Sequence, residues 1–125
     1  MSSWPFHVAV YDAINAALPS PVYDAVPDNA TYPYTVLDTQ NASDAQLLSK
    51  QRERIRIYLS HWSETQGQQE VLGMMRTVKD AIQNRKLTLT TGQTIGLVVV
   101  SGTTQRDIAA ETYTGLQTIE AIVNT

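Results

Sequence analysis

The segment from Arg54 to Asn84 changes its spacing of polar and apolar residues once, and this change predicts a strand followed by a helix. From residue 54 to residue 59 the two kinds of residue alternate, as in a strand with one buried face. The residues on that face are Ile55, Ile57 and Leu59. From residue 68 to residue 84 the apolar residues recur at helical spacing instead. This stripe consists of Val71, Met75, Val78 and Ile82. An apolar strand face next to an apolar helix stripe predicts that the helix covers the sheet.

The N-terminal part of the chain predicts another amphipathic helix, over residues 5–18. Its apolar side comprises Phe6, Val10, Ala13, Ile14, Ala17 and Leu18. Pro19 and Pro21 then end the helix, because proline removes a backbone donor and restricts the residue before it. Residues 22–26 predict a short extended segment after this stop.

Three further segments have the pattern of strands. Residues 34–39 alternate polar and apolar side chains. Residues 94–101 are almost all apolar, which predicts a strand in the centre of the sheet or one covered on both faces. Residues 109–123 predict a long last strand with Gly115 as a bulge or bend. Between these segments, we expect a short strand at Leu87–Thr90 and a polar link at residues 102–107.

The predicted order is helix, strand, strand, helix and then two or three strands, in a single domain over residues 1–125. This is an α+β fold with a mostly antiparallel sheet and both helices on one face. The polar segment Gln40–Gln51 is too long for a tight turn, so we expect the two flanking strands to extend into it as a protruding hairpin arm. Leu47 and Leu48 lie in this arm, and two adjacent leucines among polar residues indicate a contact with another protein.

The composition narrows the functional classes. The chain of 125 residues has a net charge of −3, which argues against a domain whose main task is to hold nucleic-acid phosphates. Cysteine is absent, so neither disulfides nor thiolate metal sites are available. No apolar run approaches the ~18 residues that cross a membrane, and the N-terminus lacks the pattern of a signal peptide. We therefore expect the protein in a cytoplasm, or in a particle assembled there.

A basic stripe runs along the arm and the strand that follows it. It consists of Lys50, Arg52, Arg54 and Arg56. Their even spacing along a strand places all four on the face opposite the buried one. Four interpretations stay open for this stripe: an ordinary solvated sheet face, charges that blunt an edge strand, a contact with acids of a neighbouring subunit, and a surface that faces DNA.

No residue pattern predicts catalysis. Neither His7 nor His61 lies in a catalytic or metal-binding motif, and the glycines lack the spacing of a phosphate loop. His61 lies two residues after Leu59 and therefore on the same face of the strand. We expect it to be a hydrogen-bonded structural histidine at the end of the buried face. The sequence thus predicts no enzyme, no cofactor and no metal site. An active site on the open sheet would depend on His61 beside Trp62 and Tyr58 alone.

Three motifs give the chain a resemblance to a known family. The run Val22-Tyr23-Asp24-Ala25-Val26-Pro27 is followed by Tyr32-Pro33-Tyr34-Thr35-Val36-Leu37, and later by Ile57-Tyr58-Leu59-Ser60-His61-Trp62-Ser63 before the second helix. This order resembles the small tail-completion or tail-terminator proteins of long-tailed bacteriophages, prophages and gene transfer agents. The resemblance covers the chain from about residue 6 to its end. The chain departs from the family at Glu64-Thr65-Gln66-Gly67, where Arg or Gly often follows the Trp-Ser pair.

The resemblance implies a structural virion protein of the tail or neck, present in the host cytoplasm during assembly. It implies a hexameric ring that ends the tail tube, stops its polymerisation and offers a surface to the head-side connector or stopper protein. DNA would pass through the lumen without specific binding. The alternative is another neck component, such as a head-completion or stopper protein. A ring contact of this kind needs two different patches, and the arm and the opposite sheet edge are our candidates. The candidate interface residues are Leu47, Leu48, Lys50, Arg52, Arg54 and Arg56.

Overall fold

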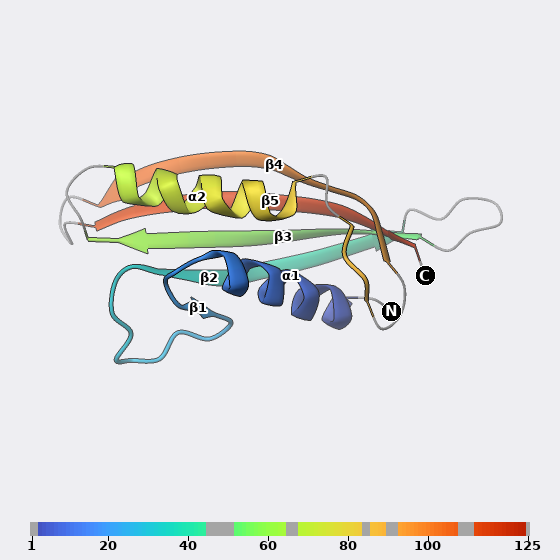
Figure 1. Cartoon of the computed structure of the whole chain (residues 1–125), viewed down its shortest axis with the longest axis horizontal. Coiled ribbons are helices and arrows are strands. Elements are labelled where there is room, and N and C mark those ends of the chain that lie inside the picture. Colours follow the sequence, from blue (N-terminus) through green and yellow to red (C-terminus); the bar gives the residue numbers. More distant parts are fainter. Residues whose placement is uncertain are drawn as a thin grey trace.

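The computed structural model describes residues 3–44, 52–64, 68–83, 86–89, 93–107 and 112–124. Two helices and five strands make up these parts of the chain (Figure 1). They follow in the order α1 (Ser3–Ala17), β1 (Val22–Tyr23), β2 (Tyr34–Asp44), β3 (Arg52–Ser63), α2 (Gln69–Ile82), β4 (Gln93–Asp107) and β5 (Thr112–Asn124). The predicted α+β class and its order of elements are confirmed, with the short extended segment after the first helix forming β1.

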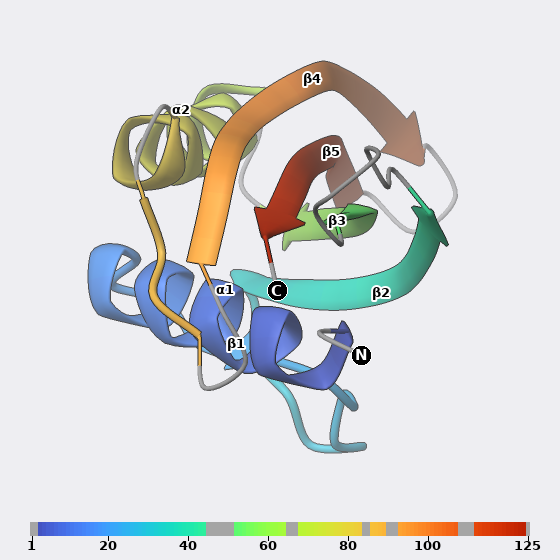
Figure 2. The same cartoon turned by 90° about the vertical axis from the view of Figure 1, so that its right-hand side faces the viewer.

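The strands form one sheet in the order β1-β2-β3-β5-β4. The pairs β2–β3, β3–β5 and β5–β4 are antiparallel, and only the two-residue strand β1 is parallel to its neighbour. Both helices lie on the same side of this sheet, which is strongly twisted (Figure 2). The prediction of a mostly antiparallel sheet with two helices on one face is therefore confirmed.

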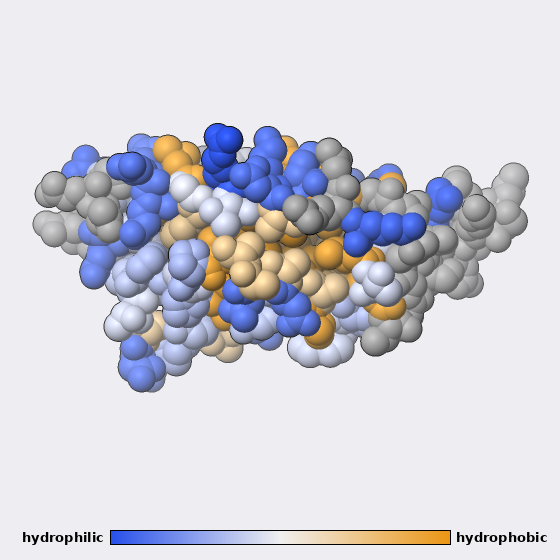
Figure 3. Space-filling model, viewed as in Figure 1, coloured by the Kyte–Doolittle hydropathy of each residue, from blue (hydrophilic) through white to orange (hydrophobic). Residues whose placement is uncertain are grey.

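The hydrophobic core lies between the helices and the sheet. Helix α1 buries Phe6, Val10 and Ile14 completely, which is the predicted apolar side of that helix. Helix α2 buries its own stripe, and β3 and β5 contribute the inward-facing residues of the sheet. These strand residues are Ile55, Ile57, Leu59, Ile119, Ala121 and Val123. Figure 3 shows the helix-covered side, with apolar residues gathered at its middle and hydrophilic residues towards its margins.

Two glycines allow α2 to lie close against the sheet. A Cβ atom at Gly102 would lie 2.9 Å from Cε of Met75, and one at Gly115 would lie 2.7 Å from Sδ of Met75 and would also collide with Cγ1 of Val71. The predicted bulge at Gly115 is wrong, because Gly115 pairs in register with His61 on one side and Thr104 on the other. The glycine instead serves the close approach of a helix to the sheet.

Strand β4 differs from its prediction in length and in position. The residues expected to form a polar link, 102–107, continue the strand to Asp107. The strand is also not central, since it pairs only with β5 and forms an edge of the sheet. Its apolar part is covered by α2 on one face only, so that Leu97 is buried while Val100 is 45% exposed. The expected short strand at Leu87–Thr90 is absent from residues 86–89, where the structure has a single bridge residue at Thr88.

The strands β2 and β3 extend into the segment predicted as an arm. Residues 40–44 continue β2 and pair with β3 as far as Glu53, after a register shift between Leu37 and Thr39. The remaining residues of the predicted arm, 45–51, lie outside the described residues. The projection of its tip therefore stays a prediction.

The close approach of α2 leads to a pair of expected outcomes. Gly115→Ala should lower the free energy of unfolding by about 1–3 kcal/mol, because overpacking forces Val71 and Met75 to move. Gly73→Ala is the matched control, since an added Cβ at Gly73 meets no heavy atom within 4 Å. It should stabilise the protein by up to about 1 kcal/mol, because alanine favours the helix. Urea unfolding measures both values, and an unchanged Gly115→Ala protein would contradict the packing.

Candidate functional site

The sheet face opposite the helices is the candidate functional site. Arg52, Arg54 and Arg56 of β3 occupy alternate positions, opposite in parity to the buried residues of that strand, so they share this open face. Leu47, Leu48 and Lys50, the other predicted interface residues, lie outside the described residues. The structure thus brings three members of the basic stripe together and leaves the others as predictions.

A single carboxylate joins two of these arginines. Glu120 of β5 lies directly opposite Arg56 in the sheet and accepts a hydrogen bond of 2.6 Å from Nη2 of that arginine. Its other oxygen lies 3.2 Å from Nε of Arg54. The hydrogen bond to Glu120 raises the pKa of Arg56 above its ordinary value, so its charge is fixed. The side chains of Arg54 and Arg56 are nonetheless 49% and 43% exposed, and one acid does not neutralise three arginines.

Glu120 could not be found from the sequence. It lies far from the stripe along the chain, and only the pairing of β3 with β5 places it between the two arginines. The sequence does indicate which face Glu120 lies on. Its neighbours Ile119 and Ala121 are buried, and side chains alternate along a strand, so Glu120 faces the open side.

His61 is completely buried and has a partner for each ring nitrogen. Nδ1 lies 2.7 Å from Oγ1 of Thr35, and Nε2 lies 2.7 Å from Oε1 of Gln117. The side-chain amide of Gln117 donates a hydrogen bond of 2.8 Å to the backbone carbonyl of Met75. Since Oε1 of Gln117 can only accept, Nε2 of His61 carries the proton and Nδ1 accepts from the Thr35 hydroxyl.

This geometry confirms the structural role predicted for His61. Burial lowers the pKa of His61 below its ordinary value, and the hydrogen bond to Gln117 opposes this shift only in part. The imidazole is therefore neutral, and both of its nitrogens are used within the fold. An active site built on His61 is not compatible with these contacts.

Four aromatic side chains gather at the end of the sheet where β2 begins and β3 ends. The ring centroid of Tyr34 lies 5.3 Å from that of Tyr32, 5.9 Å from that of Tyr23 and 6.3 Å from that of Trp62. Burial, together with the nearby Tyr32 hydroxyl, raises the pKa of Tyr34. The indole N–H of Trp62 donates to Oγ of Ser60, 2.9 Å away. These contacts hold together residues from the three sequence motifs that resemble the tail-completion family.

The described residues were also compared with the requirements of a metal site and of a membrane-spanning helix. Within the described part of the chain, no three side chains of His, Asp or Glu are placed to hold a metal ion. Neither described helix is long and apolar enough to cross a membrane.

The fold and this face define a small α+β protein with two helices on one side of a sheet and, opposite, a side that no described helix or strand covers and that carries the arginines of β3. The family described as "Tail completion protein gp17" matches residues 7–124. The chain belongs to this family. It is a tail completion protein, a structural component of the virion tail and not an enzyme.

A solved structure agrees with this assignment at the level of the fold. It is described as "Virion of native gene transfer agent (GTA) particle" and contains a chain that is 22% identical to this one, with a TM-score of 0.85. The similarity covers 98% of this chain and 96% of that chain. No curated protein matches the chain.

The buried imidazole predicts a pH dependence. In the unfolded chain His61 has a pKa near 6.5, whereas in the folded protein its pKa is lower. The unfolded state therefore binds the proton more readily, and stability is fully present above about pH 6.5 and falls as the pH drops towards the folded pKa. Urea unfolding between pH 7.5 and about pH 5 measures the slope.

Two variants test whether His61 causes this pH dependence of the stability. His61→Gln should remove the contribution of this side chain to the pH dependence, while His7→Gln should leave that contribution in place. An identical slope in the wild type and His61→Gln proteins would contradict the neutral, buried state of His61.

Proposed function

We propose that this chain forms a hexameric ring on the end of the tail tube, where it terminates tube polymerisation and forms the tail side of the head–tail junction. The family supports a role in completing the tail. The observation that carries the ring is that the sheet has two different open edges. Strand β1 pairs only with Thr35 and Val36, so no described strand covers the rest of β2, and none covers the outer edge of β4.

Two unlike edges suit a head-to-tail contact between copies. A contact of this kind repeats around a closed ring when the rotation between copies closes. Strand directions alternate across β2, β3, β5 and β4. A copy rotated about an axis along the strands would therefore place its β4 beside β2 of its neighbour in antiparallel direction, with side-chain contacts in place of strand pairing at the register shift between Val99 and Ser101. The tail tube protein and the head-side connector or stopper would then bind the two ends of such a ring.

Tail length tests this proposal directly. Tails assembled without this chain should have tubes that are longer than normal and variable in length, and adding the purified protein should restore a single length. Negative-stain electron microscopy measures the distribution. Tubes of normal length in its absence would contradict termination. If the protein binds the isolated portal-side ring and not the tube, it acts instead as a head-completion or stopper protein.

We also propose that the basic stripe meets acids of the adjacent subunit. Glu120 already engages two of its members, and the chain as a whole is acidic, so DNA passes the stripe without specific binding. Exposed carboxylates that a neighbour can offer include Asp24 and Asp28 in the connection between β1 and β2. Screening by salt should weaken such exposed pairs.

The expected result is that rings dissociate more readily as the salt concentration rises from about 0.05 M to 0.5 M, and that Arg52→Gln reduces this salt dependence. Light scattering on assembled rings measures the dissociation. Lys86→Gln removes one exposed charge outside the stripe and serves as the control. Duplex DNA binding that falls steeply with salt would instead assign the stripe to the lumen.

A further inference from the structure

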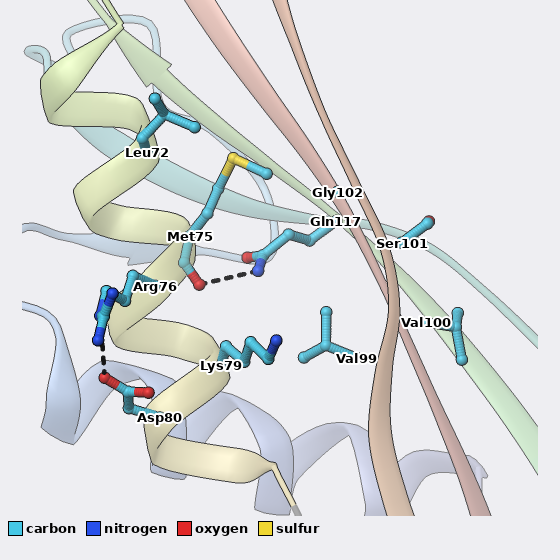
Figure 4. A pocket seen from close by; sticks show the side chains of 10 residues that line it. All are labelled: Leu72, Met75, Arg76, Lys79, Asp80, Val99, Val100, Ser101, Gly102 and Gln117. Carbon is cyan, nitrogen blue, oxygen red and sulfur yellow. Dashed lines mark hydrogen bonds and ion pairs between the residues drawn. The ribbon is translucent and has the colours of Figure 1, made fainter.

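A groove runs between α2 and the edge strand β4. It has a volume of about 660 Å³. Leu72 and Met75 line it on the helix side and Val99 faces them from the strand, while polar residues such as Asp80 and Gln117 complete the lining (Figure 4). Leu72 is 50% exposed although it is a large apolar residue, and Val99 opposite it is only half-buried. An exposed apolar side chain at the mouth of a groove is typical of a surface that another protein segment covers.

The groove also contains the cationic side chain of Lys79. In Figure 4, Lys79 extends from α2 towards Val99 across the groove. Its neighbour Arg76 is paired, with Nε 3.8 Å from Oδ2 of Asp80. Lys79 makes no ion pair with any residue that the structure describes. A segment that brings a carboxylate together with large apolar side chains would therefore complement this groove in both charge and hydrophobicity.

Between Val99 and Ser101, the edge of β4 is unsuited to pairing with another strand. The backbone N–H of Val99 donates to Oε1 of Gln83 at 2.9 Å, so one outward donor is already used. The register also shifts between Val99 and Ser101, which leaves Val100 as the extra residue of a bulge. Both features blunt an edge against strand addition. The occupant of the groove is therefore held by its side chains.

We propose that this groove receives the tip of the β2–β3 hairpin of a second copy of the chain. This inference rests on the proposed ring and names its two contact surfaces. Residues 45–51 join the two strands and contain Leu47 and Leu48, which are the only adjacent leucines in the sequence. Asp44 precedes them. The segment thus combines two apolar side chains with a carboxylate, which is the combination that Leu72, Val99 and Lys79 require.

We assign the tip to another copy because the path along the sheet to its own groove is longer than the backbone of the tip can reach. The seven residues between Asp44 and Arg52 can reach out and back by about 14 Å at full extension. Val99 lies level with Ile57, five residues along β3 from Arg52, and two strand spacings away across β5. These offsets combine to about 19 Å. The contact therefore joins two copies through unlike surfaces, and it repeats from copy to copy around a ring.

The absence of cysteine from the sequence allows a clean crosslinking test. Leu48→Cys is made in one preparation of the full chain and Leu72→Cys in another, and the two are mixed with tail tube protein and treated with a short bis-maleimide. We expect a covalent dimer of one copy of each variant, and none from either variant alone. Leu48→Cys mixed with Val8→Cys is the matched control, because Val8 is also exposed, at 38%, but lies on α1 away from the groove.

The outcomes separate this inference from the proposed function. Rings that control tube length but give no crosslink between positions 48 and 72 would overturn the groove contact and leave the function standing. A crosslink without control of tube length would establish the contact and overturn the function. A dimer formed by Leu48→Cys alone would show a like-with-like contact and would also overturn the inference.

A charge reversal tests the role of Lys79 without changing the apolar walls. Lys79→Glu should raise the protein concentration needed for ring assembly by about tenfold, since a favourable pair becomes a repulsive one. Lys86→Glu makes the same change of charge at an exposed position outside the groove and should have little effect. Circular dichroism of both variants establishes that they fold. Equal effects of the two substitutions would contradict the assignment of Lys79 to the contact.

Discussion

Helix α2 is joined to the sheet by a buried chain of hydrogen bonds that runs from Thr35 through His61 and Gln117 to the carbonyl of Met75. This chain crosses β2, β3 and β5 before it reaches the helix. Buried polar groups are costly when they lack partners, so each member fixes the position of the next. Gly102 and Gly115 complete the arrangement, because they let Met75 and Val71 pack directly on the strands.

The position of α2 decides which surfaces of the sheet stay available. Because both helices pack on one face, no described helix covers the arginines and aromatic rings of the opposite face. Because α2 reaches β4 but does not extend past it, a groove stays open at the sheet edge, and Lys79 in it forms no ion pair with the described part of the chain. Among the described residues, one side of the sheet is thus packed against the helices for stability, while the other side and the edges stay open. This division suits a subunit of a virion tail better than an isolated protein.

Periodicity predicted the elements whose two faces differ most in polarity. The stripes of α1 and α2 and the alternation around Ile57 were sufficient, and the parity of His61 with Leu59 correctly placed the histidine at the end of the buried face. The same reasoning failed for β4. Its second half, residues 102–107, is polar because it belongs to an edge strand, and polar residues without alternation read as a link.

The parts of the site that depend on pairing could not be predicted. Glu120 lies between Arg54 and Arg56 only because of the register of β3 with β5, and a single sequence contains no direct signal of that register. The sequence around Gly115 predicts a bulge or bend for a similar reason, since the close contact of this glycine with Val71 and Met75 involves a distant helix. The groove beside β4 likewise depends on where α2 crosses the sheet.

The most direct measurement is an electron cryomicroscopy map of the head-proximal end of the tail tube. The account predicts a closed ring of copies of this chain at that position, with the α2–β4 groove of each copy occupied by the β2–β3 hairpin of the next. A map in which these grooves face solvent, or in which the tube ends without this chain, would contradict the account.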